Sequence, residues 1–169
     1  MKKLILASAL GLCSLAAQAS ESNVSVEFVQ PERYQDINAS GNQNQARYQE
    51  RLFKTLEKQF QESANDLPNG MTLDVKVLDI DLAGAVAMGL GMGQDIRQVS
   101  DKDFPRILFY VVLKDQNGKI LLQGKQNLRD ANLRHNEFRL RGSQSDFYME
   151  TAIVKKWFDG ALIPAVAKL

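Results

Sequence analysis

The stretch ILFYVVLKDQNGKILLQGKQNLR, residues 107–129, decides the fold. Its first part, Ile107–Leu113, is continuously apolar, which indicates a strand that is central in its sheet or covered on both faces. Asp115–Gly118 then predicts a tight turn, because asparagine and glycine accept the backbone conformations that hairpin turns require. The returning strand is expected over Ile120–Arg129. The stretch therefore predicts an antiparallel strand pair.

A strand, a helix and a further strand are expected before this hairpin. Val24–Val29 carries β-branched and aromatic residues and stops before Pro31, as strands do. Met71–Leu82 alternates like a strand, but its apolar phase changes after Val77, which requires a bulge, a twist or burial on both sides. Between them, Gln43–Asn65 is expected to be an amphipathic helix, because apolar residues recur at intervals of three and four. These residues are Tyr48, Leu52, Phe53, Leu56, Phe60 and Ala64.

The C-terminal part predicts a second helix. Ser143 or Ser145 offers a capping hydroxyl, and Glu150 would lie near the positive helix N-terminus. Gly160 and Pro164 are expected to end this helix. The buried side would be formed by Phe147, Val154, Trp157 and Phe158. We therefore expect an α+β domain with the order β-α-β-β-β-α, in which two helices pack on one face of a mixed or antiparallel four-stranded sheet.

The first residues have the pattern of a cleavable secretory signal. Lys2 and Lys3 precede the apolar run Leu4–Leu15, which is shorter than the roughly 20 residues that span a bilayer. Ala17-Gln18-Ala19 is a small-x-small cleavage pattern. We expect residues 1–19 to be removed after Ala19, so that residues 20–169 remain as one periplasmic domain without a transmembrane segment.

The composition of the expected mature domain excludes several kinds of catalytic and metal site. Its only cysteine, Cys13, would leave with the leader, which excludes a disulfide, a thiol nucleophile and a thiolate metal site. The single histidine, His135, has polar neighbours, and the sequence has no Gly-x-Ser-x-Gly nucleophile motif, so we expect His135 to be exposed and non-catalytic. We expect no metal and no cofactor. Loss of Lys2 and Lys3 leaves 19 basic against 20 acidic residues, a net charge of −1 that predicts no nucleic-acid binding.

Several short motifs together resemble a bacterial secreted family catalogued as domain of unknown function 3016. The resemblance runs from about Val24 to Phe158, and it implies a secreted α+β domain but no particular activity. Where the family pattern has an acidic residue after the run Asp79–Gly84, this chain has Ala85. The motifs are Glu27-Phe28 with Pro31-Glu32, Asp79–Gly84, Asp95-Ile96-Arg97, Pro105-Arg106-Ile107, Asp115 with Gly118, Gly124 with Leu128-Arg129-Asp130, and Trp157-Phe158.

Asp79 and Asp81 form an acidic pair two residues apart. On a strand both carboxylates point to one face, where they can bind a cation or perform acid–base chemistry. The alternative is that both face solvent after a bulge. Only two carboxylates are local, whereas calcium takes six to eight oxygen ligands.

The glycine-rich segment Ala83–Phe104 is expected to be a long loop. It carries Met88, Leu90 and Met92, and flexible methionine-rich surface adapts to a partner or an acyl chain. The alternative is a lid over the domain's own core. Asp95 and Arg97 are expected to serve as structural punctuation with a surface ion pair, which contributes little if exposed.

A basic stretch, with Asp130 and Glu137 interleaved, begins in the returning strand of the predicted hairpin and contains Lys125 and His135 besides four arginines. Guanidinium groups bind the phosphates of lipid, lipopolysaccharide or nucleic acid in bidentate fashion. The alternative is a solvated connection. The arginines are Arg129, Arg134, Arg139 and Arg141.

Three functions from different classes follow. The first is a non-catalytic binding or accessory protein of the cell envelope, whose partner is an envelope protein or lipid. The second is an enzyme that uses Asp79 and Asp81, with or without a divalent cation, and the third is a lipid or acyl-chain carrier. The contact candidates for the first are Met88, Leu90, Met92, Arg129, Arg134, Arg139 and Arg141. Partner identity and oligomeric state do not follow from the sequence.

Overall fold

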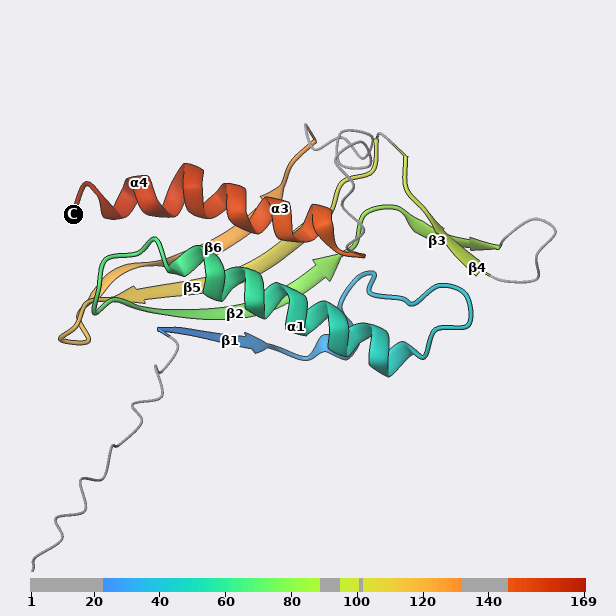
Figure 1. The fold of residues 1–169 in the computed structure, drawn as a ribbon, viewed down its shortest axis with the longest axis horizontal. Coiled ribbons are helices and arrows are strands. Elements are labelled where there is room, and N and C mark those ends of the chain that lie inside the picture. The colour runs from blue at the N-terminus through green and yellow to red at the C-terminus, as the bar shows by residue number, and fades with distance from the viewer. Residues whose placement is uncertain (1–22, 89–94, 101, 132–145) are drawn as a thin grey trace, which may run out of the picture.

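The computed structural model describes residues 23–88, 95–100, 102–131 and 146–169. Its main sheet has four strands in the order β1-β2-β5-β6 (Figure 1). β1 is parallel to β2, and the other neighbouring strands are antiparallel. The strands are β1 (Val24–Phe28), β2 (Thr72–Asp81), β5 (Arg106–Lys114) and β6 (Ile120–Arg129). The predicted α+β fold with a mixed four-stranded sheet is confirmed.

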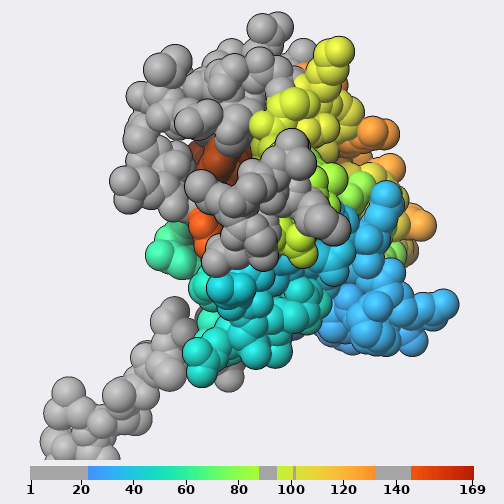
Figure 2. All heavy atoms as spheres, turned by 90° about the vertical axis from the view of Figure 1, so that its right-hand side faces the viewer, coloured from blue at the N-terminus to red at the C-terminus, as the bar shows by residue number. Residues whose placement is uncertain are grey.

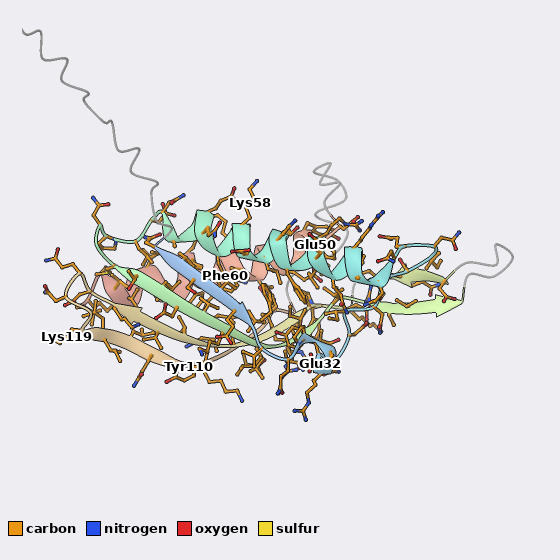
Figure 3. All side chains as sticks on the ribbon, turned by 90° about the horizontal axis from the view of Figure 1, so that it is seen from below. Glu32, Glu50, Lys58, Phe60, Tyr110 and Lys119 are labelled. Carbon is orange, nitrogen blue, oxygen red and sulfur yellow. The ribbon has the colours of Figure 1, made fainter. Side chains whose placement is uncertain are left out.

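Helices cover one face of this sheet, and the other face is open (Figures 1 and 3). α1 (Gln45–Ala64) connects β1 to β2 after a short 3-10 turn, η1 (Pro31–Arg33). α3 (Tyr148–Trp157) runs on into η2 (Phe158–Leu162) and α4 (Ile163–Val166). No helix in the described ranges combines the length and the apolar character needed to cross a membrane.

The sequence of α1 explains both its start and its buried face. The side chain of Asn44 accepts a hydrogen bond from the N–H of Arg47 at 3.1 Å, so it satisfies one of the free donors of the first turn. The predicted apolar stripe lies against the sheet, while Phe53 at its margin stacks on Phe28 with ring centroids 4.3 Å apart. The buried residues of the stripe are Tyr48, Leu52, Leu56, Phe60 and Ala64.

Aromatic side chains join the two helices to the central strand β5. The ring of Phe109 meets that of Phe60 edge-on at 5.5 Å and that of Trp157 at 5.0 Å. Phe60 and Phe109 have no exposed surface, so each makes a large hydrophobic contribution. Figure 3 shows Phe60 between α1 and the sheet, and Tyr110 on the side of the sheet away from the helices.

The phase change predicted in the second strand is a β-bulge. The register of β2 against β5 shifts between Val77 and Asp79. Before the bulge Val75 and Val77 point into the core, and after it Ile80 does. The bulge thus keeps apolar residues on the helix side both before and after it, although Leu78 at the bulge is exposed, and it places Asp79 and Asp81 on the open face.

The segment predicted as one long loop contains a second, two-stranded sheet. β3 (Ala85–Met88) and β4 (Asp95–Gln98) pair as an antiparallel hairpin that projects beyond the end of the main sheet (Figure 1). Alanine and glycine have weak strand propensity, so pattern alone gave no strand signal here. The hairpin is fixed by long-range contacts of Arg97, which are described below.

The C-terminal helix also differs from expectation. Its N-cap residue is Phe147, so a cap by Ser143 or Ser145 was wrong; both serines lie outside the described residues. Gly160 and Pro164 do not end the helix. Gly160 lies within η2, a π-helical turn in which the N–H of Ile163 donates to the carbonyl of Phe158. Pro164 then occupies the first turn of α4, where a missing N–H is tolerated.

Candidate functional site

Strand β6 ends the main sheet on one side, and it is the longer of the two edge strands. It has ten residues, whereas β1 on the opposite edge has five. An edge strand presents unpaired backbone N–H and C=O groups, and these form a template on which another extended chain can pair. Within the described residues no strand pairs with the outer edge of β6.

The hydrogen bonds show which residues of β6 face that outer edge. In the hairpin the N–H of Asp115 donates to the carbonyl of Lys119 at 3.0 Å, so Asp115 faces β6. Backbone direction alternates along a strand, so every second residue from Asp115 back along β5 to Ile107 directs its N–H and C=O towards β6. The residues of β6 that are paired with them direct theirs towards β5. The residues of β6 between those partners direct their N–H and C=O outwards. They are Gln123, Lys125, Asn127 and Arg129.

A second observation gives the same assignment from the other side of the sheet. The N–H of Leu73 donates to the carbonyl of Asn23 at 2.8 Å, so Leu73 and Val75 of β2 face β1. Val75 is paired with Val111, which therefore faces away from β2 and towards β6. Val111 is in turn paired with Gly124, which faces inwards. Lys125 must then face outwards.

A groove runs beside the C-terminal half of this edge, between β6 and α3. Its volume is about 300 Å³, and its lining residues are Asn127, Leu128, Arg129, Asp130, Ile153, Lys156 and Trp157. Leu128, Ile153 and Trp157 form an apolar floor, since the last two are only 3% and 8% exposed. Trp157 packs edge-on against both Phe109 and Phe158, with ring centroids 5.0 Å apart in each pair, so its ring is held on two sides.

The rim of the groove is charged, with a positive excess. Lys156 forms an ion pair with Asp130 across it. The guanidinium group of Arg129 lies over the ring of Phe104, 4.6 Å from its centroid, a cation–π contact that holds the charge in place. Lys125 is exposed on the same face of β6 as Arg129. None of the outward-facing residues of β6 is acidic.

The acidic pair lies on the open face, and one member is engaged by protein groups. Asp79 accepts hydrogen bonds from Nη1 of Arg106 and from the N–H of Gln35, both at 2.8 Å. Burial, together with the charges of Asp36 and Asp79, raises the pKa of Asp81. In the described part of the chain no group of three or more histidine, cysteine, aspartate or glutamate side chains is arranged to hold a metal ion.

Arg97 has the structural role expected of it, but its partners are residues far away in the sequence. Nη1 and Nη2 each donate to one oxygen of Asp36 at 3.0 Å, a bidentate pair whose side chains are only 13% and 20% exposed. The same guanidinium donates to the carbonyls of Asn38 and Gly84 at 3.0 and 3.2 Å. The expectation of a merely superficial ion pair was wrong. Figure 2 shows this end of the molecule, with the yellow-green hairpin strands beside the blue and cyan connection between β1 and α1.

Glu150 of α3 contacts the same segment, which leads into the β3–β4 hairpin. It lies in the first turn of α3, as predicted, but its side chain is 4% exposed and accepts a hydrogen bond from the N–H of Ala83 at 3.1 Å. Burial raises the pKa of this carboxyl, while the bond from Ala83 and the charge of Arg97 oppose the rise. Glu150 and Arg97 therefore hold the start of the hairpin from two directions.

The predicted contact residues do not all lie in the described ranges. Arg129 lines the groove, and Met88 ends strand β3 of the projecting hairpin, which belongs to a different sheet. Sequence reasoning interpreted Trp157 only as a core residue and did not single out Ile153 or Lys156. Leu90, Met92, Arg134, Arg139, Arg141 and His135 lie outside the described residues, as do residues 1–19, which were expected to form a leader.

Comparison with known proteins adds a family to this geometry. The family model described as "Protein of unknown function (DUF3016)" matches residues 22–160. The chain belongs to the DUF3016 family. The matched range covers every strand of the DUF3016 domain, all of α1 and α3, and thus both walls of the groove. Neither the curated proteins nor the solved structures gave a match.

Proposed function

We propose that this DUF3016 protein is a non-catalytic binding or accessory protein of the bacterial cell envelope, and that it contacts its partner through the groove between β6 and α3. The observation that carries the proposal is the coincidence of a groove of about 300 Å³, with an apolar floor and a charged rim, with the outer edge of a ten-residue strand. Binding sites typically combine an apolar floor with a few polar groups that fix orientation. Leu128, Ile153 and Trp157 supply the first, and the β6 backbone supplies the second.

Asp79 and Asp81 support the enzymatic alternative less strongly than the groove supports a binding function. A general base or a metal ligand needs a carboxylate oxygen that is free to meet its proton or ion. Both oxygens of Asp79 accept hydrogen bonds from Arg106 and Gln35. Asp81 alone would then have to carry the chemistry.

The leader sequence supports the assignment to the envelope. Lys2 and Lys3, the apolar run Leu4–Leu15 and the alanine pattern before residue 20 are together typical of secretory signals. Export would place the groove among periplasmic and outer-membrane polypeptides. A cytoplasmic fraction that holds the chain with its first residues intact would contradict this part of the proposal.

The proposal is tested by photocrosslinking in intact cells. A benzoylphenylalanine at position 156 places the reactive group at the groove, because the side chain of Lys156 is 63% exposed beside it. Position 58 is the matched control, since Lys58 is also an ion-paired lysine on a helix, 73% exposed but on α1. We expect a discrete protein adduct from position 156 and none from position 58. The same adduct from both positions, or none from position 156, would contradict the proposal.

A lipid partner would give a different result in the same experiment. An acyl chain in the groove would give a lipid-mass adduct at position 156, and native mass spectrometry of the gently extracted protein would show bound lipid. That result would support the lipid-carrier alternative instead.

A further inference from the structure

We infer that the groove and the outer edge of β6 together bind an extended polypeptide segment of alternating apolar and acidic residues, which adds to the main sheet as a fifth strand. The inference rests on the proposed function and specifies the partner's chemistry. It is argued from the backbone direction of β6, from the two different surfaces beside its outer edge, and from the charges along it.

The backbone of β6 selects a polypeptide over other ligands. Four residues in alternation, Gln123, Lys125, Asn127 and Arg129, each direct one N–H and one C=O to the open edge. Only another extended backbone presents donors and acceptors at the same spacing. An acyl chain would leave all of these groups without a partner. An added strand therefore matches this edge in a way that a lipid does not.

The two faces of an added strand would meet different surfaces. Side chains on the helix side would enter the groove above Leu128, Ile153 and Trp157, where apolar groups are removed from water. Side chains on the open side would lie next to Lys125 and Arg129, where opposite charges stabilise neighbouring strands. Since successive residues of a strand alternate between faces, the preferred sequence alternates apolar with acidic residues.

The same charges disfavour a second copy of the chain at this edge. A two-fold pairing of β6 with β6 of another copy is isologous, so each face of the joined strands repeats the same side chains. In a two-fold pairing centred on Asn127, Lys125 of each copy would lie opposite Arg129 of the other, and in one centred on Lys125 the two lysines would lie opposite each other. Like charges on adjacent strands are destabilising. A monomeric elution volume at micromolar concentration is therefore expected, and a stable dimer that Lys125→Glu disrupts would contradict the assignment to a foreign segment.

The first test uses synthetic peptides with the whole mature chain. The probe is a short capped peptide that alternates valine with glutamate and carries a fluorophore, and binding is followed by anisotropy. Its first control replaces every glutamate with lysine, and its second carries N-methyl groups on alternate backbone nitrogens. We expect saturable binding of the glutamate peptide, at least about tenfold weaker binding of the lysine peptide, and loss of binding on N-methylation. Equal binding of all three peptides, or saturable binding of none, would overturn the inference.

The second test removes one outward donor from the protein. Lys125→Pro deletes an N–H that faces the open edge and leaves the ladder with β5 complete, while Lys125→Ala removes the same side chain and keeps the N–H. We expect Lys125→Pro to weaken peptide binding at least about tenfold relative to Lys125→Ala. Thermal unfolding of both variants checks that each is folded, and the N-methylated peptide tests the same bond if the proline variant is not.

Crosslinking from position 156 separates the inference from the proposed function. If the adduct persists in Lys125→Pro as strongly as in Lys125→Ala, the groove binds its partner without strand addition, and only the inference fails. If the unaltered chain gives no adduct, the proposed function itself fails. Loss of the adduct in Lys125→Pro alone supports both.

Discussion

Replacement of Arg97 by methionine tests whether a buried ion pair holds the β3–β4 hairpin to the main sheet. The guanidinium makes a bidentate bond to Asp36 and further bonds to the carbonyls of Asn38 and Gly84. Removing one partner of such a pair leaves the other charge desolvated, which costs about 3–5 kcal/mol when burial is complete. Because Asp36 keeps some contact with solvent, at 20% exposure, we expect Arg97→Met to lower the free energy of unfolding by about 3 kcal/mol.

Urea unfolding followed by circular dichroism gives this value, and a double-mutant cycle isolates the pair. We expect the double variant with Asp36→Asn to be about 2 kcal/mol more stable than the sum of the single effects predicts. Lys58→Met is the control, because it breaks an exposed ion pair with Glu62 and should cost less than about 0.5 kcal/mol. A cost for Arg97→Met below about 1 kcal/mol, with a coupling near zero, would refute the structural role of Arg97.

Three further substitutions test other parts of the structure. Burial raises the folded-state pKa of Glu150, so the stability that this carboxyl contributes is present below its unfolded pKa of 4.5 and is lost as pH rises through the folded pKa. Glu150→Gln should therefore become more stable relative to the unaltered chain as pH rises over this range. A difference in urea midpoints that does not change with pH would contradict this prediction. Gln126→Pro should lower the free energy of unfolding by about 2 kcal/mol more than Lys125→Pro, because only the former removes a hydrogen bond to β5. Equal destabilisation of the two variants in thermal unfolding would show that the edge assignment is wrong. Gly84→Ala should destabilise by about 2 kcal/mol or more, because φ is +79° and the new Cβ would lie 2.1 Å from the carbonyl oxygen of Gln98; an unchanged melting temperature would contradict this.

Features set by neighbouring residues were predictable from the sequence. The turn at Asp115–Gly118 and the stripe of α1 depend on local spacing, and both appear as expected. The phase change after Val77 predicted a bulge, a twist or burial on both sides, and the structure has the bulge. The α+β class followed from the order of these elements.

Features set by distant residues were not predictable. The pairing of Arg97 with Asp36 joins positions 61 residues apart, and nothing near Arg97 distinguishes it from a surface arginine. The groove depends on where α3 lies along β6, and the pattern of α3 indicated its buried side without showing which strand it covers. The helix continues past Gly160 and Pro164 because a π-helical turn precedes the proline, and no single-residue rule indicates such a turn. The one clear signal for the site was topological: the last strand of a hairpin is free to be an edge.

Hydrogen exchange of the individual β6 amides tests the central claim most directly. In the free protein the N–H groups of Leu122, Gly124, Gln126 and Leu128 should exchange slowly, and those of Gln123, Lys125, Asn127 and Arg129 should exchange rapidly, because only the first set bonds to β5. Addition of the alternating valine–glutamate peptide should slow the second set and leave the first unchanged. Equal protection of both sets before any peptide is added would contradict the account, because the edge of β6 would then not be free to pair.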